Sequence, residues 1–364
     1  MNGDKSLIHV LPSNSWGGVE RYVFDICRHF KSEGWNVTVI TRGAKVVDSM
    51  FEKEGLTLRC APFRGLFDFQ SVSILIDAIR EAADSDIIVH VHGFRKAISA
   101  LLAKRLSRRN DVKVIMTRHK VKRGIDSWLL HKTYEKMDAI IFVSNLAKER
   151  FLSTWYSLLL PFKSTDLYVI HNSLNIPEPD YHERKKTSLV IAMFHGPLRP
   201  GKGLEVLIDA LAMIRKEKFR LRIVGAGKPD YVDELRRRAI KQGVMEMIDW
   251  HRHTDNPLQL IEDCDFGILP SQTEEAFGLS NIEYMASGRP QIATSNGAQS
   301  EYITDGREGF LIPPGDSKIL AETIRKMIVN PELRTKMGEK AIQTFRENLS
   351  WNKFIKRLAP VYLS

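Results

Sequence analysis

Short apolar segments alternate with longer amphipathic segments along almost the whole chain, and this alternation restricts the possible folds more than any other feature. The short segments have the length and composition of buried β-strands. Between them, apolar residues recur at helical spacing, as Tyr22, Ile26 and Phe30 do. A strand, helix, strand order is typical of parallel sheets whose faces are covered by helices. The sequence therefore predicts an α/β fold built on parallel strands.

The alternation occurs twice, and a polar stretch with two prolines separates the two series. In the first series we predict strands over residues 7–11, 36–41, 56–60, 87–92, 113–117, 139–143 and 168–170. In the second we predict strands over residues 189–194, 220–224, 266–269, 291–294 and 309–312, and helices that begin near Leu204, Tyr231, Ser317 and Pro331. Pro177 and Pro179 disfavour regular structure, so we expect a hinge near them. A chain of 364 residues is long enough for two domains that each bury a core.

The composition is that of a soluble globular protein, with 43% apolar and 27% charged residues. No apolar run is long enough to cross a bilayer, and the first predicted strand begins too early to leave room for a signal peptide. We therefore expect the protein to be cytoplasmic. Cys27, Cys60 and Cys264 are odd in number and widely spaced, which indicates reduced thiols and neither a disulfide framework nor a metal site.

Basic residues are concentrated in one segment of the chain. The net charge is +10, and the segment from Arg95 to Arg123 holds eleven basic residues against one acid, Asp111. Four of the cations have the spacing of one helix face near a helix C-terminus: Lys104, Arg105, Arg108 and Arg109. Such cations can be favoured by the helix dipole alone, or they can bind anionic lipid headgroups or a phosphate-bearing acceptor. We favour the second interpretation because the charge continues into the next loop, and we expect no nucleic-acid partner because no recognition motif with interleaved aromatic residues is present.

Two acids in the second half, Glu275 and Glu283, follow the predicted strand over residues 266–269. Glu275 lies in the polar loop after this strand, and Glu283 lies in the helix that comes next. In an open parallel sheet, ligands bind at the carboxyl ends of the strands. Carboxylates only accept hydrogen bonds, so this pair suits a polyhydroxyl ligand such as a sugar or a ribose. Taken alone, the same acids could also be solvated residues that the helix dipole favours.

A long ordered pattern around these acids resembles the donor-site signature of the retaining glycosyltransferases of family 4. The pattern covers residues 270–294 and continues through Gly297, Glu301, Asp305-Gly306 and residues 309–316. The resemblance implies the GT-B fold, which has two facing doubly wound Rossmann-like domains. It predicts an acceptor-side domain over residues 1–178, a nucleotide-sugar-binding domain over residues 179–346, and a C-terminal helix over residues 347–364 that crosses back to the first domain. It also implies a retaining transfer from a nucleoside-diphosphate sugar that needs neither a metal ion nor a cofactor.

The resemblance also assigns roles to individual residues. Glu275 is expected to hold hydroxyls of the transferred sugar, Glu283 to bind the ribose, and Lys202 to neutralise the diphosphate. Pro197 stands where the family has an arginine, so we expect Arg199 to supply the missing positive charge. The expected donor-binding residues are Gly17, Gly18, Gly196, Arg199, Lys202, Gly225, Glu275, Phe277, Gly278, Leu279 and Glu283, and the expected catalytic residues are Glu275, Lys202, Arg199 and His119.

Residues at strand ends in the first half are expected beside the donor diphosphate or on the acceptor side. Gly17 and Gly18 lie between the first strand and the first helix, where glycine allows the backbone to approach a ligand and the helix start offers amides to an anion. His92 and His119 end predicted strands, and the resemblance implies that they line the acceptor side together with Arg118. Of the two histidines, we expect His119 to lie nearer the reacting centre.

Other polar residues near strand ends are expected to be structural. His90 is expected to point to the face opposite His92 and to serve in packing. Ser144 is expected to cap a helix. Metal-dependent glycosyltransferases of another fold bind an ion through Asp-x-Asp, but here Asp84-Ser85-Asp86 and Asp263-Cys264-Asp265 directly precede apolar strands, so we expect these acids to support strand entry.

The sequence thus predicts a retaining glycosyltransferase that acts on a hydroxyl of an envelope glycolipid or polysaccharide. The segment from Arg95 to Arg123 is expected to attach it to the inner face of the plasma membrane. Pro197 favours an alternative, a noncatalytic paralogue that binds a sugar nucleotide or a partner enzyme. A third interpretation is a sugar-nucleotide epimerase or phosphorylase of the same fold, which the basic segment disfavours. The donor base, the sugar, the acceptor and the linkage are not predicted.

Overall fold

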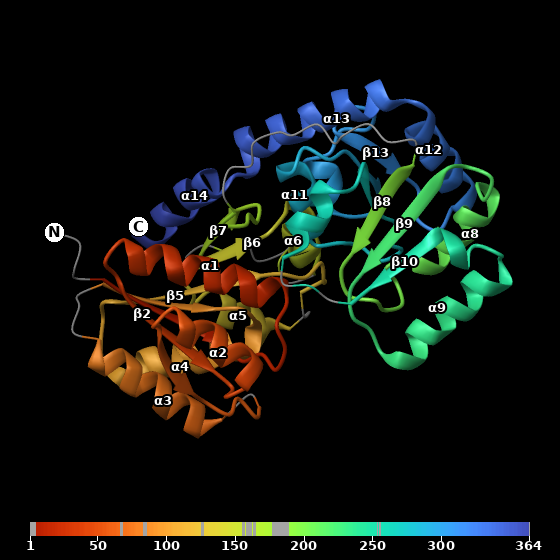
Figure 1. The fold of residues 1–364 in the computed structure, drawn as a ribbon. Helices are drawn as coiled ribbons and strands as arrows, with labels where there is room; N and C mark the ends of the chain where they lie inside the picture. Colours follow the sequence, from red (N-terminus) through yellow and green to blue (C-terminus); the bar gives the residue numbers. More distant parts are fainter. Residues whose placement is uncertain are drawn as a thin grey trace. The chain divides into compact units, whose positions relative to one another are not determined.

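The computed structural model describes residues 5–65, 68–82, 86–124, 127–154, 157, 162, 165–176, 189–252, 254 and 256–363. The chain forms two compact units (Figure 1). The first comprises residues 1–174 and 354–364, and the second comprises residues 175–353. The expected hinge at Pro177 and Pro179 and the expected boundary after residue 178 lie outside the described residues, as do Asp84 and Ser85. Among the described residues, no helix is long and apolar enough to span a bilayer.

The first unit is built on a seven-stranded sheet in which all neighbouring strands are parallel. The strands are β1 (Lys5–Leu11), β2 (Asn36–Thr41), β3 (Thr57–Cys60), β4 (Asp86–Val91), β5 (Val112–Arg118), β6 (Ala139–Phe142) and β7 (Asp166–Val169). Their order across the sheet is β3-β2-β1-β4-β5-β6-β7. The chain therefore runs outward from β1 and later restarts at β4, so the topological switch point lies between β1 and β4.

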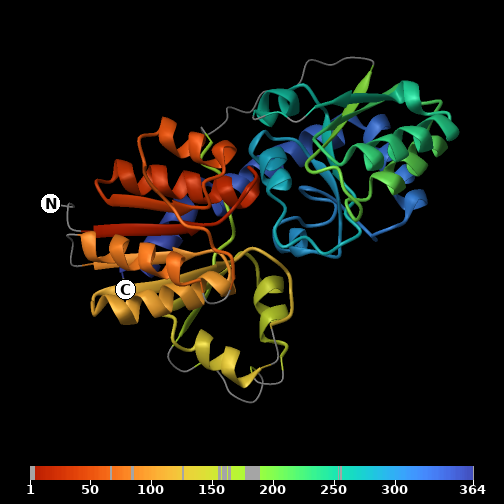
Figure 2. The ribbon, with the colours of Figure 1, turned by 90° about the horizontal axis from the view of Figure 1, so that it is seen from below.

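Helices cover both faces of this sheet, because crossovers between parallel strands are right-handed and the chain reverses its direction across the sheet. They are α1 (Gly18–Ser32), α2 (Lys45–Lys53), α3 (Phe69–Glu81), α4 (Phe94–Ser107), α5 (Trp128–Tyr134) and α6 (Asn145–Leu152). Figure 2 shows α1 and α2, in red shades, on one face and α3 and α4, in orange, on the other. The buried side of α1 carries Tyr22, Ile26 and Phe30, as the helical spacing predicts. Ser144 caps α6 by accepting a hydrogen bond from the Ala147 amide, which confirms its predicted role.

The C-terminal helix completes the core of the first unit. This helix, α14 (Trp351–Leu363), follows a π-helical turn, η3 (Phe345–Leu349), and its residues from Phe354 onward belong to the first unit. The Phe354 ring lies 5.6 Å from the Tyr22 ring, and the Tyr362 ring lies 5.1 Å from the Phe30 ring. Because all four rings are buried, α14 packs against the face of the sheet that carries α1.

The second unit is built on a six-stranded parallel sheet. The strands are β8 (Val190–His195), β9 (Phe219–Val224), β10 (Ile248–His251), β11 (Phe266–Leu269), β12 (Gln291–Thr294) and β13 (Gly309–Ile312). Their order is β10-β9-β8-β11-β12-β13, which puts the switch point between β8 and β11. The loops that follow these two neighbouring strands leave the sheet at the same edge.

Helices surround this second sheet and enclose an aliphatic core. They are α8 (Leu204–Met213), α9 (Pro229–Lys241), α10 (Pro257–Glu262), α11 (Leu279–Ala286), α12 (Ser317–Val329) and α13 (Pro331–Thr344), with the short 3-10 turns η1 (Met245–Met247) and η2 (Ala298–Glu301). Phe194, Leu207 and Ile292 are among its fully buried residues. Asp265 Oδ2 accepts a hydrogen bond of 2.8 Å from the Ile191 amide, which confirms that this acid supports a strand entry.

The predicted strands are confirmed, with small differences at their ends. β10 was not predicted, because it is short and carries the polar Asp249 at the edge of its sheet. β4 ends at Val91, so His92 follows the strand. The prediction that Lys104, Arg105, Arg108 and Arg109 share one helix face is wrong for the last two, because α4 ends at Ser107 and Arg108 adopts a left-handed conformation with φ of 61°.

Candidate functional site

Two glycine-containing loops at the switch point of the second unit form the frame of the candidate site. The loop after β8 contains Gly201 and Gly203, which have φ values of 86° and 75°. A Cβ atom on Gly203 would lie 1.8 Å from the Pro270 carbonyl oxygen, so this position requires glycine for close packing as well as for its conformation. The Gln272 amide donates a hydrogen bond of 2.9 Å to the Gly201 carbonyl. The loops after β8 and β11 are therefore held against each other.

Lys202 and Glu275 meet across these two loops. Lys202 Nζ donates to Glu275 Oε1 at 2.6 Å, and Ser271 Oγ donates to the same oxygen at 2.6 Å. Both side chains are largely buried, with exposed fractions of 13% for Lys202 and 19% for Glu275. Burial by itself raises the pKa of the Glu275 carboxyl, but Lys202, Ser271 and Arg199 outweigh this effect and leave the pKa below its usual value. Glu275 is therefore ionised at neutral pH.

Glu283 lies one turn into α11 and contacts a histidine that was not among the predicted site residues. Glu283 Oε2 lies 3.0 Å from His195 Nε2, and both side chains are almost fully buried. Ser280 Oγ donates a hydrogen bond of 3.1 Å to the His195 carbonyl. His195 is the last residue of β8, so its position at the switch point was the signal that could have identified it.

The start of α11 is braced by a tyrosine. The Tyr302 hydroxyl donates to the Phe277 carbonyl, and Asn281 Nδ2 donates to the Tyr302 hydroxyl at 3.0 Å. The Phe277 ring is buried 5.1 Å from the Tyr302 ring. Gly278, with φ of 85°, leads into Leu279, the first residue of the helix. The predicted residues 277–279 therefore lie in a fixed turn beside Glu275.

The remaining predicted residues of the second unit lie in the same group of loops. A Cβ atom on Gly225 would lie 2.0 Å from the Gly196 carbonyl oxygen, so Gly225 is required for close approach of two backbone segments. Gly196 itself has φ of 144° and donates its amide to the Val224 carbonyl at 3.0 Å. Arg199 is exposed and close enough to lower the pKa of Glu275. The structure thus brings all the predicted residues of the second unit together.

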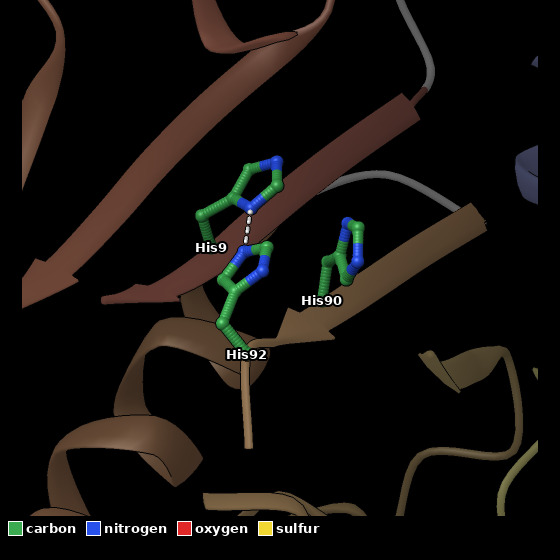
Figure 3. A group of neighbouring side chains, drawn as sticks. All are labelled: His9, His90 and His92. Atoms are coloured by element: carbon green, nitrogen blue, oxygen red, sulfur yellow. Dashed lines mark hydrogen bonds between the residues drawn. The ribbon is translucent and has the colours of Figure 1, made fainter. Parts of the chain in front are cut away.

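In the first unit, the predicted acceptor-side histidines belong to a cluster of imidazoles. His92 Nδ1 lies 3.1 Å from His119 Nε2, and His92 Nε2 lies 3.1 Å from His9 Nδ1. Figure 3 shows His9 on β1 beside His90 and His92, which come from β4 and its end. Burial lowers the pKa of both His9 and His119 to about 3, so these two imidazoles are neutral at physiological pH.

The prediction that His90 points away from His92 is wrong. Residues two apart on a strand share a face, and the rings of His90 and His92 lie 4.6 Å apart between centroids. His90 is fully buried and uses both nitrogens, Nδ1 at 2.7 Å from the Tyr362 hydroxyl and Nε2 at 2.7 Å from Thr117 Oγ1. It therefore serves in packing, as predicted, but on the same side as His92.

The other predicted residues of the first unit lie outside this cluster. Arg118, at the end of β5, places its guanidinium 4.6 Å from the centre of the Phe151 ring and donates to the Lys122 carbonyl at 3.2 Å. Gly17 and Gly18 are exposed at the start of α1, and Gly17 has an extended backbone with φ of −168°. Their presence at a helix start is as predicted, and a ligand role for them stays a prediction.

Part of the basic segment is neutralised by ion pairs within the first unit. Lys104 Nζ lies 3.0 Å from Asp138 Oδ2, and Arg109 pairs with Asp111 at 2.5 Å. Arg105 and Arg108 are exposed. Because two of the four cations at the end of α4 are paired, the positive charge that this region offers to a partner is smaller than the sequence count indicates.

Comparison with known proteins identifies relatives along nearly the whole chain. Residues 16–178 match the family model described as Glycosyltransferase Family 4, and residues 178–344 match the model described as Glycosyl transferases group 1. The chain is 26% identical over 359 residues to the putative glycosyltransferase EpsD of Bacillus subtilis, with 92% of this chain and 90% of EpsD covered. It is 24% identical over 365 residues to the O-antigen chain mannosyltransferase C of Escherichia coli, with 96% of this chain and 95% of that protein covered.

The fold is similar to that of a solved structure, Alr3699/HepE of Anabaena in complex with UDP and glucose. The TM-score is 0.80 at 19% sequence identity, with 98% of this chain and 99% of that chain covered. Two parallel α/β units together with this likeness show the GT-B fold. Because the two family models together span residues 16–344, the chain belongs to the group 1 glycosyltransferases of family 4 and is an enzyme of that class.

Proposed function

We propose that this enzyme transfers a sugar, with retention of its anomeric configuration, from a nucleoside diphosphate to a hydroxyl of an envelope glycolipid or polysaccharide. The contact between Lys202 and Glu275 carries the proposal, because it places a cation and an ionised acid at the edge of the sheet where ligands bind. A sugar nucleotide has a diphosphate and several hydroxyls, which need these two kinds of group. The similarity to HepE, whose crystal structure contains UDP and glucose, supports such a donor.

In this proposal, the charges of the second unit act on the leaving group. Glu275 accepts hydrogen bonds from hydroxyls of the transferred sugar, because an ionised carboxylate has only acceptor sites. Lys202 and Arg199 stabilise the negative charge that develops on the diphosphate as its bond to the sugar breaks. The acceptor hydroxyl attacks on the face from which the diphosphate leaves, and its proton passes to the departing phosphate oxygen. No protein nucleophile and no metal ion take part in this scheme.

Glu283 and His195 form the second part of the proposed donor site. His195 Nε2 lies 3.0 Å from one carboxylate oxygen of Glu283. An ionised carboxylate only accepts hydrogen bonds, so Glu283 suits the two ribose hydroxyls. We expect His195 to orient Glu283 for this purpose.

The first unit is proposed to bind the acceptor. His92, His119 and Arg118 lie at or just beyond the carboxyl ends of β4 and β5, where ligands bind in open sheets. The exposed Arg105 and Arg108 support attachment to an anionic membrane from the cytoplasmic side. The relative that is named as an O-antigen chain mannosyltransferase supports an envelope polysaccharide as the acceptor.

Thermal unfolding with a panel of nucleoside diphosphates tests this proposal most simply. A ligand that binds only the folded state stabilises it by about 2.7 kcal/mol at a hundred times its Kd, so the matching base will give the largest rise in Tm. The nucleoside-diphosphate sugar of that base should raise the Tm further. The Glu275→Ala variant will lose this additional stabilisation, and the variant of its exposed neighbour, Glu274→Ala, will keep it. A chain that no nucleoside diphosphate stabilises would contradict the proposal.

Pro197 is the observation that favours a noncatalytic binding protein, since it replaces an arginine of the family's diphosphate loop. Hydrolysis of the donor in the absence of acceptor separates the two functions. We expect the wild-type protein to hydrolyse the donor slowly and Glu275→Ala to hydrolyse it more slowly still. Equal background rates in both proteins, together with unchanged donor binding, would support the noncatalytic function.

A further inference from the structure

Three histidines of the first unit form a continuous chain of ring contacts from the interior of the sheet to its edge. His9 Nδ1 lies 3.1 Å from His92 Nε2, and His92 Nδ1 lies 3.1 Å from His119 Nε2. The planes of the His9 and His92 rings differ by 6°, with centroids 5.3 Å apart, as expected for two rings that meet edge to edge through nitrogen atoms. His9 is fully buried, and His92 and His119 are partly exposed.

The hydrogen bonds in these two contacts must run in the same direction along the three histidines, from donor to acceptor. A neutral imidazole has one N–H donor and one acceptor nitrogen, and each contact needs one of each. His92 takes part in both contacts, so it donates in one and accepts in the other. The chain therefore runs either from His9 to His119 or from His119 to His9.

The buried end of the chain selects between the two directions. His9 Nε2 is buried and has no hydrogen-bond partner among the described residues. If the chain ran toward His9, the Nδ1 atom of His9 would accept and its proton would lie on the unpartnered Nε2. Buried N–H groups without an acceptor are rarer than unmatched acceptors, so the proton of His9 belongs on Nδ1, where it is donated to His92.

We propose that His9 acts as a positioning residue, which through His92 fixes the tautomer of His119 with its proton on Nδ1. His9 Nδ1–H donates to His92 Nε2, and His92 Nδ1–H donates to His119 Nε2. The remaining nitrogen of His119 then offers an N–H, which suits an oxygen atom of a bound hydroxyl or phosphate. The inference rests on the proposed function only for the identity of that oxygen.

The electrostatics of the cluster support uncharged rings throughout the chain. Burial lowers the pKa of His92 well below its usual value, and the neighbouring histidines His90, His119 and His9 lower it further. Burial also lowers the pKa of His9 and of His119, each to about 3. Each ring in the chain therefore carries a single proton at neutral pH, as the argument on direction requires.

A metal ion could in principle bind the same group, since one ligand atom each from His9, His90 and His92 lie within 4.8 Å of one another. The contacts of His90 disfavour this interpretation. Both of its nitrogens are already bound at 2.7 Å, to Tyr362 and to Thr117, and the site would have to give up one of these hydrogen bonds. The observed geometry is therefore that of a hydrogen-bonded chain.

Nitrogen-15 NMR of the histidine side chains in the full-length protein tests the proposal, because the shifts of Nδ1 and Nε2 distinguish the two tautomers. We expect wild-type His119 to carry its proton on Nδ1. The His9→Phe variant lacks the N–H group that His9 donates to His92, so His119 is expected to populate both tautomers. In His9→Asn the side-chain amide nitrogen lies near the former Nδ1 position and can donate again, so the wild-type tautomer is expected to return.

Tyr362→Phe serves as the matched control, since it removes a buried hydrogen bond of His90 and leaves the contacts between His9, His92 and His119 in place. It should leave the His119 tautomer unchanged. A wild-type His119 with its proton on Nε2, or a tautomer that does not respond to His9→Phe, would overturn the proposal. Shifts of His9, His90 and His92 on addition of one equivalent of Zn²⁺ would also overturn it, because they would identify a metal site.

Kinetics add a readout that depends on the proposed function. His9→Phe is expected to raise the KM for the acceptor roughly tenfold, the effect of one lost hydrogen bond, and to leave donor affinity unchanged. His9→Asn should restore the KM. If the enzyme proves inactive with every acceptor, the NMR result still decides the tautomer, so failure of the proposed function and failure of this inference can be told apart.

Discussion

The switch points of the two units share a topology and differ in charge. In the second unit, the loops after β8 and β11 bring a lysine and an ionised glutamate to within 2.6 Å. In the first unit, β1 and β4 bring together imidazoles whose pKa values are lowered by burial. One sheet edge therefore offers fixed charges, and the other offers uncharged donors and acceptors.

This difference shows that the fold provides the location while the side chains at strand ends determine the chemistry. Fixed charge suits a diphosphate, whose negative charge increases as it leaves. Uncharged imidazoles suit the hydroxyl group of a sugar acceptor. Such a hydroxyl needs hydrogen bonds, but a net charge beside it would add little to its binding. The proposed donor site and the proposed acceptor-side residues can thus be distinguished by their response to loss of charge and to pH.

The largest expected effect comes from removing the cation of the donor site. Lys202→Met keeps most of the side-chain volume but removes the charge, and kcat is expected to fall about 10²- to 10³-fold. Lys216→Met, at an exposed position of the same unit, is the control and should behave like the wild type. Steady-state kinetics with saturating donor would measure the effect. A Lys202→Met enzyme within twofold of the wild-type kcat would show that the lysine does not assist the leaving group.

The next prediction concerns pH and the stability of the first unit. His9 and His119 have folded-state pKa values of about 3 against 6.5 in the unfolded chain, so between these values the unfolded chain binds more protons. The free energy of unfolding of the first unit must therefore fall as the pH falls, by about 1 kcal/mol for each such histidine between pH 6 and pH 5. Hydrogen exchange of the β1 and β4 amides, corrected for the intrinsic rate, would measure this loss.

The second unit provides the internal control for this pH effect. The pKa of Glu275 lies below its usual value of 4.5, so the stability that this group contributes is present above pH 4.5 and is lost only as the pH falls through its lower folded value. Protection of the β8 and β11 amides should therefore change little between pH 6 and pH 5. An equal loss of protection in both units would contradict the assignment of pH sensitivity to the histidines.

A smaller effect is expected at Arg199, which we propose supplies the positive charge that Pro197 lacks. Arg199 is exposed and lowers the pKa of Glu275 from a distance, so Arg199→Ala should weaken donor binding and turnover by roughly fivefold to tenfold. Arg215→Ala, another exposed arginine of the second unit, is the matched control. Unchanged kinetics and unchanged donor affinity in Arg199→Ala would mean that Arg199 does not compensate for Pro197.

The smallest effect is expected at the surface of the first unit. Replacing both Arg105 and Arg108 by Gln should weaken binding to anionic vesicles, at about 1 kcal/mol for each cation near the membrane, and added salt should weaken it as well. Replacing Lys216 and Lys318, two exposed cations of the second unit, provides the control. Co-sedimentation would measure both. Vesicle binding that is absent or independent of salt would count against this surface as the docking site.

Much of the fold could be predicted because buried parallel strands are short apolar runs. All residues of β11 and β12 are buried, and the predicted bounds of both strands are those observed. β10 was missed because an edge strand with Asp249 and Trp250 lacks such a run. The loops that we propose for donor binding were selected by a long sequence pattern, and their ligand role stays a prediction.

The contacts within the sites depended on tertiary structure. Lys202 and Glu275 are 73 positions apart, and nothing in the local sequence shows that their side chains meet. His9 was missed because it faces His90 only through the register between β1 and β4. The shared face of His90 and His92 was available from their spacing of two, and the prediction misassigned it.

A crystal structure of the enzyme soaked with its nucleoside-diphosphate sugar tests the central claim most directly. We expect Glu275 Oε1 or Oε2 within hydrogen-bond distance of a sugar hydroxyl, Lys202 Nζ within the same distance of a diphosphate oxygen, and Glu283 against the ribose. A donor bound elsewhere, or one bound with Lys202 and Glu275 still paired and out of its reach, would contradict the account.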